Sequence, residues 1–138
     1  MSEYEIVYLA SEYLNRTWDV MQFWASVSFG LIALSHLGAR HLNILIASLV
    51  SLLYIGFTLF VMNMLRVNGA VVTGFLTQLK DLPEAGTPLG AGALAIISTA
   101  PNPLQMAAIV LAFFGLFLGS LVFLWFSVLR ARKAAQAT

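Results

Sequence analysis

The sequence predicts an all-α integral membrane protein with three transmembrane helices, an amphipathic N-terminal helical extension and a long connection between the second and third spans. Hydrophobic residues make up 60% of the 138 residues and charged residues only 9%, which is too little charged surface for an ordinary water-soluble domain. Three stretches, 20–39, 43–65 and 104–129, contain no Asp, Glu, Lys or Arg. Each reaches the roughly 20 residues that a helix needs to cross a bilayer. We expect one membrane domain over residues 1–138.

Residues 2–19 are predicted to form an amphipathic helix that precedes the first span. Ser2 and Glu5 match the S-x-x-E capping box, which marks a helix start. Charged side chains then recur on one helical face, at Glu5, Glu12, Arg16 and Asp19, and Glu12 and Arg16 have the i,i+4 spacing of a favourable pair. No Gly or Pro occurs before Gly30, so we expect one long helix. This acidic segment lacks the basic region of a secretory signal, and we expect the first span to be retained.

The first two spans are joined by only a few residues, so they are expected to be antiparallel neighbours. Residues 67–103 form the predicted extramembrane connection, which is partly helical. The second helix continues to about Lys80, or a short helix begins after Gly69. The apolar stretch 89–100 is too short to span. Contact with its own helices or another subunit is the preferred interpretation, and a re-entrant segment is the alternative. Pro103 suits the first turn of the third helix.

The basic tail, residues 130–138, predicts the orientation of the protein in the membrane. Arg130, Arg132 and Lys133 directly follow the third span and act as the expected topology anchor. Counting Arg40, four basic residues lie on this side, against three on the other side at Arg16, Arg66 and Lys80. The positive-inside rule then places the C-terminus in the cytoplasm and the N-terminus outside. We expect a bacterial inner membrane protein.

Small residues recur on one face of the third span, at Ala108, Ala112, Gly115 and Gly119. Helices in lipid associate through close backbone approach, and G-x-x-x-G is a common pattern at such contacts. The favoured interpretation is that this small face packs on the first or second helix of the same chain. An interface between subunits is the alternative.

Two further sets of residues suggest contacts between spans. Asp19 is expected to form an ion pair with Arg66 across helices, or with Arg16 on its own helix, because charges near hydrocarbon are costly when unpaired. A charged ring at a pore mouth is the alternative. Polar residues of the second span could share one face, at Ser48, Ser51 and Thr58. Packing is their default role, and a hydrated path through the membrane is the alternative.

The sequence offers little for catalysis or cofactor binding. It has no cysteine, and the two histidines, His36 and His41, are too few for a metal site and too close in the chain for axial haem ligation. G-x-S-x-G, H-E-x-x-H and Walker A motifs are absent. Three basic tail residues without interleaved aromatics do not predict nucleic-acid binding. We therefore expect no enzyme activity, cofactor, metal or nucleic-acid partner.

These observations predict a non-enzymatic, multi-pass membrane protein that acts through helix–helix association in the lipid bilayer. A small homo-oligomer is the favoured form, and a pore or channel lined by the polar face of the second span is one version of it. The alternative is an accessory subunit that docks on a larger membrane complex, such as a respiratory or transport complex.

Overall fold

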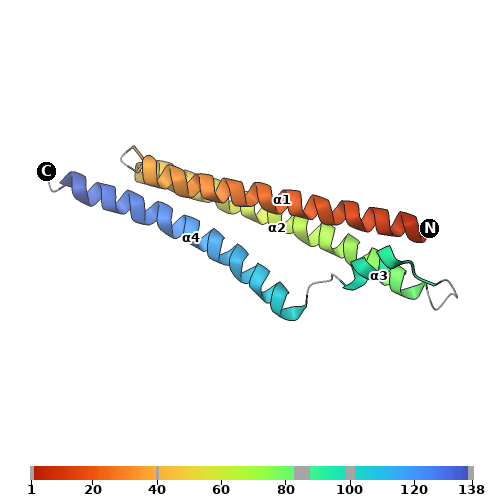
Figure 1. Ribbon diagram of the computed structural model, residues 1–138. Helices are drawn as coiled ribbons and strands as arrows, with labels where there is room; N and C mark the ends of the chain where they lie inside the picture. Colours follow the sequence, from red (N-terminus) through yellow and green to blue (C-terminus); the bar gives the residue numbers. More distant parts are fainter. Residues whose placement is uncertain (1, 40, 83–87, 99–101, 137–138) are drawn as a thin grey trace.

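The fold is a bundle of three long helices with one short helix at an end. The computed structural model describes residues 2–39, 41–82, 88–98 and 102–136. Within them lie α1 (Glu3–Leu37), α2 (Ile44–Asp81), α3 (Ala91–Ser98) and α4 (Pro103–Gln136). Figure 1 shows α1 and α2 side by side, α3 near the N-terminus and α4 diverging from the pair toward its own N-terminal end. The predicted all-α class is confirmed for the described residues.

The start of α1 confirms the predicted capping box. The Glu5 N–H donates to Ser2 Oγ at 3.3 Å, and the Ser2 N–H donates to Glu5 Oε2 at 2.8 Å. Hydrogen bonds from the backbone and then the side chain of Ser2 lower the pKa of Glu5. The helix runs unbroken into the first apolar stretch, as expected. Glu12 Oε1 and Arg16 Nη2 lie 3.4 Å apart and form the predicted i,i+4 pair.

The second helix continues through Gly69 to Asp81 as a single element. Asn43 caps its start, because Asn43 Oδ1 accepts the Ile46 N–H at 2.8 Å. A glycine within a helix costs about 1 kcal/mol relative to alanine. Packing offsets that cost here, since Val72 and Leu79 beyond Gly69 are buried. Of the two predicted arrangements, the longer second helix is the correct one.

Three helices, α1, α2 and α4, are long and apolar enough to cross a membrane. At a rise of 1.5 Å per residue, helices of 35, 38 and 34 residues are each roughly 50–57 Å long. A hydrocarbon core is only about 30 Å thick. All three helices are therefore longer than a span requires. The residues of α1 and α2 outside the predicted spans 20–39 and 43–65 lie mainly toward the end that carries α3.

A hydrophobic cluster built from three helices holds that end together. Ile6 of α1, Leu79 of α2 and Ala93 of α3 are buried in it. Glu3 Oε1 also accepts the Gly90 N–H at 3.0 Å, which joins the first turn of α1 to the residue before α3. The apolar segment 89–100 thus contacts its own helices over its described part, as the preferred interpretation expected. Residues 83–87 and 99–101, including Glu84 and Pro101, lie outside the described residues.

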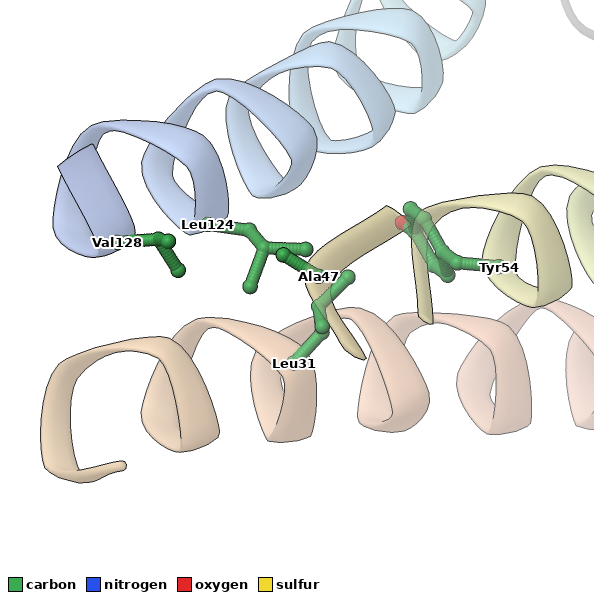
Figure 2. Close-up of a cluster of buried hydrophobic side chains, with 5 residues drawn as sticks. All are labelled: Leu31, Ala47, Tyr54, Leu124 and Val128. Carbon is green, nitrogen blue, oxygen red and sulfur yellow. The ribbon is translucent and has the colours of Figure 1, made fainter. Parts of the chain in front are cut away.

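The second hydrophobic cluster lies at the opposite end, where α4 joins α1 and α2. Figure 2 shows its buried side chains turned toward one another from the three helices, namely Leu31, Ala47, Tyr54, Leu124 and Val128. The start of α4 is capped reciprocally: the Gln105 N–H donates to Asn102 Oδ1 at 2.8 Å and the Asn102 N–H donates to Gln105 Oε1 at 3.0 Å. Pro103 occupies the first turn, as predicted. Residues 102–112 are nevertheless all exposed, so α4 is held mainly by its second half.

Leu79→Ala tests the cluster at the α3 end. Leu79 is fully buried, and truncating a buried leucine costs about 2–5 kcal/mol. We expect faster amide exchange in the first turns of α1, the last turns of α2 and α3, with α4 unchanged, in hydrogen-exchange mass spectrometry. Leu94→Ala is the control, because Leu94 is 54% exposed. Equal effects of the two substitutions would contradict the assignment of this core.

Candidate functional site

The third long helix packs on the other two through an aromatic and aliphatic face. This face carries residues at steps of three and four, namely Phe113, Phe117, Ser120, Leu124 and Val128. The indole of Trp24 in α1 stacks on Phe113, with ring centroids 3.9 Å apart and planes 13° apart. The ring of Tyr54 in α2 lies 5.6 Å from that of Phe117. Large rings therefore make the contact of α4 with its own chain.

The four predicted small residues lie on the other side of α4. Helical spacing places Ala108, Ala112, Gly115 and Gly119 opposite the aromatic face, and all four are exposed. A Cβ built on Gly115 or Gly119 would meet no atom within 4 Å among the described residues. The favoured interpretation was that this small face packs within the same chain. It is wrong, because α4 contacts α1 and α2 through its aromatic face instead. The face remains available to another chain.

Two of the three polar residues predicted on α2 lie in the contact between helices. Trp24 Nε1–H donates to Thr58 Oγ1 at 3.1 Å, and Trp125 Nε1–H of α4 donates to Ser51 Oγ at 3.1 Å. Ser48 is exposed and does not join them. Because Ser51 and Thr58 already hold tryptophan partners and are buried, they support packing rather than a hydrated path.

This polar contact also includes two residues that were not predicted from the sequence. Ser28 Oγ and Tyr54 Oη are 2.7 Å apart. Trp24 takes part from a buried position, since it is only 3% exposed, whereas Trp18 of the same helix is 60% exposed. A sequence signal was present: Ser28 and Ser35 in one helix, and Ser51 and Thr58 in the next, recur at steps of seven, the repeat typical of packed helix faces.

One buried polar group of α2 has no hydrogen-bond partner among the described residues. The amide nitrogen Nδ2 of Asn68 donates to none of their acceptors, although the residue is only 6% exposed. Buried side-chain nitrogens are usually hydrogen-bonded to protein or water. The buried amide nitrogen of Asn68 is therefore left without a hydrogen bond among the described residues.

The predicted ion pair across helices does not form. Arg66 Nη2 lies 3.5 Å from Asn63 Oδ1 on its own helix, and Arg16 pairs with Glu12. Among the described residues Asp19 has no salt bridge to either arginine, and it is exposed. The bonds Trp24–Thr58 and Ser28–Tyr54 set the register of the two helices, and continuing it places Asp19 level with Asn63, about one turn short of Arg66.

The histidines and the basic residues of the α4 tail lie at the opposite end from α3. The His36 ring is 6.5 Å from Phe123, and His41 lies in the connection between α1 and α2. The described residues contain no group of three or more His, Asp or Glu side chains placed to hold a metal ion. The predicted topology anchor, Arg130, Arg132 and Lys133, falls within the last turns of α4, which extends to Gln136. Its role in orientation stays a prediction.

Comparison with known proteins adds no assignment. No protein-family model, curated protein or solved structure matches this chain. The candidate site is therefore defined by geometry: an outward small face on α4, backed by a polar and aromatic contact among the three helices.

A double-mutant cycle of Trp24→Phe and Thr58→Val tests the polar contact. Each change removes one partner of the Trp24–Thr58 hydrogen bond. Thr58→Val keeps the shape of the side chain, and Trp24→Phe keeps an aromatic ring. Such bonds in membrane proteins contribute on average about 0.6 kcal/mol and at most about 1.7 kcal/mol, and we expect a coupling free energy in that range from reversible unfolding in mixed micelles. Thr73→Val is the control for a threonine whose hydroxyl bonds only its own helix, to Gly69 O. A coupling of zero would contradict the bond.

Proposed function

We propose that this chain is a non-enzymatic, multi-pass membrane protein that acts through helix–helix association and forms a small homo-oligomer in a bacterial inner membrane. The observation that carries the proposal is the outward small face of α4. Gly115 and Gly119 are open to the outside, while the opposite face of the same helix holds α4 to its own chain.

Lipid chains can replace protein contacts at some exposed helix faces but not at others. Exposed Leu, Ile and Phe side chains, such as Leu111 at 75% and Leu118 at 55%, are as apolar as lipid tails and need no protein partner. A glycine face differs, because it allows two helix backbones to approach closely and gain van der Waals contact that lipid chains supply less well. The small face of α4 is therefore the surface best suited to a second copy.

A pore version of this assembly has less support. Ser51 and Thr58 were its expected lining, and both give their hydroxyls to tryptophan indoles inside the chain. A pore would need a lining other than this polar face. We therefore propose association itself, rather than conduction, as the function.

The proposed orientation follows from charge. The end of the bundle that holds the tail of α4 carries Arg130, Arg132 and Lys133, and basic residues near span ends favour the cytoplasmic side. Arg40, counted with them from the sequence, lies outside the described residues. The cluster of Ile6, Leu79 and Ala93 then lies outside, beyond the bilayer. The N-terminus accompanies it.

Gly115→Ile and Gly119→Ile test the association. Each adds a branched side chain where two backbones would meet, and we expect the oligomer seen for the wild-type protein to shift to monomer in native mass spectrometry and crosslinking. The matched control is Gly56→Ile, because Gly56 is also an exposed helical glycine with no atom within 4 Å of an added Cβ, but it lies on α2. The control should keep the wild-type mass.

Two results would count against the proposal. An oligomer that persists in both α4 variants would exclude the small face as the interface. A wild-type protein that is monomeric in several lipids would instead favour the alternative, an accessory subunit of a larger membrane complex.

A further inference from the structure

A pocket lies at the basic end of the bundle, where the α1–α2 connection meets the last turns of α4. It is an open hollow with a volume of about 470 Å³. Two segments far apart in the sequence line it: residues 41–45, which join the α1–α2 connection to the first turn of α2, and Arg132 of α4. The lining residues are His41, Leu42, Asn43, Ile44, Leu45 and Arg132.

The charge around this pocket is unbalanced. The chain has no Asp or Glu between Asp19 and Asp81, and none after Glu84. The ion pair formed by the described residues joins Arg16 to Glu12 near the other end of α1. No side-chain carboxylate of the described residues therefore neutralises Arg132, and an anion from outside the chain would find an unpaired guanidinium there. Arginine binds phosphate oxygens through two parallel N–H bonds.

The backbone at the pocket favours the same charge. Asn43 Oδ1 accepts the Ile46 N–H, and the first internal backbone bond of α2 runs from the Ala47 N–H to Asn43 O at 2.9 Å. The N–H groups of Ile44 and Leu45 precede that bond, and the described residues offer them no acceptor. A helix start carries partial positive charge and free N–H donors, which suit a phosphate.

The apolar part of the lining indicates what carries the phosphate. Leu45 is 74% exposed and Ile44 41% exposed, directly beside the polar groups. Both residues begin the second apolar stretch, so they lie where a span enters the hydrocarbon. A ligand with a charged head and an apolar body fits this lining better than a free ion.

We propose that this pocket binds the phosphate group of an anionic phospholipid. Arg132 pairs with the phosphate, the N–H groups of Ile44 and Leu45 donate to its oxygens, and His41 closes the polar side. The acyl chains lie along Ile44 and Leu45. The site rests on the proposed insertion of the spans in a bilayer, but not on the proposed oligomer.

Arg132→Gln tests the site, with Arg130→Gln as the matched control. Both remove one charge from the same tail, but Arg130 does not line the pocket. The protein is reconstituted in phosphatidylcholine vesicles with and without phosphatidylglycerol. It is then extracted from the vesicles with a mild detergent and analysed by native mass spectrometry. We expect retained phosphatidylglycerol on the wild-type protein and on Arg130→Gln. Its apparent affinity should fall about tenfold in Arg132→Gln, the size of one lost charge-assisted hydrogen bond.

Asn43→Asp provides a second variant that keeps the helix start intact. Aspartate caps helices as well as asparagine, but it places a negative charge in the pocket. We expect it to lose phosphatidylglycerol while the helix content measured by circular dichroism stays unchanged. Retention of the lipid by this variant would overturn the site.

Other results would assign the bound lipid to a different cause. Equal losses in Arg130→Gln and Arg132→Gln would show general attraction to the tail and would overturn the pocket. Displacement of the lipid by inorganic phosphate at similar concentration would assign the pocket to free phosphate and overturn the lipid as ligand. A wild-type protein that fails to insert into vesicles would contradict the membrane placement itself, whereas insertion without retained lipid would overturn only the site.

Discussion

Trp24 is the residue on which the arrangement of the three long helices depends. Its indole N–H donates to Thr58 of α2, and its ring stacks on Phe113 of α4. One side chain of α1 thus contacts both neighbours, through a bond to one and a ring face to the other. Stacked aromatic pairs contribute about 0.5–1.5 kcal/mol beyond the area they bury, a range that includes the average of about 0.6 kcal/mol for a hydrogen bond between helices in a membrane. The stacking therefore matters as much as the bond.

The contact also determines which surface of α4 is left for other molecules. A helix has one face turned toward its neighbours, and in α4 that face carries the rings and Leu124 and Val128. The residues with the least side chain are consequently on the outside. Trp24 of α1 and Tyr54 of α2 meet the rings of Phe113 and Phe117, so large side chains rather than glycines make the contact within the chain.

The sequence predicted well the features that depend on neighbouring residues. Ser2 and Glu5 identify a helix start because the capping bonds close within four residues, and charge-free stretches identify the long helices because their length is a local property. Features that depend on register were predicted less well. The pairing of Asp19 with Arg66 failed because a shift of about one turn between two helices separates the side chains, and such a shift leaves no trace in composition. The role of Trp24 depends on register in the same way: a tryptophan near the end of an apolar stretch suits both the membrane interface and an inner contact, and only the positions of Thr58 and Phe113 decide between them.

The exposed first turns of α4 have a mechanical consequence. Residues 102–112 are exposed, and the contacts of α4 with α1 and α2 begin at Phe113. The first turns of α4 are therefore not packed on the other two long helices. Tilting this end would move Ala108 and Ala112 of the small face, whereas Gly115 and Gly119 belong to the part of α4 that is packed through Phe113 and Phe117. The two halves of the small face therefore differ: the alanines lie on a part of the helix without contacts to α1 or α2, and the glycines lie on a part that those contacts hold in place.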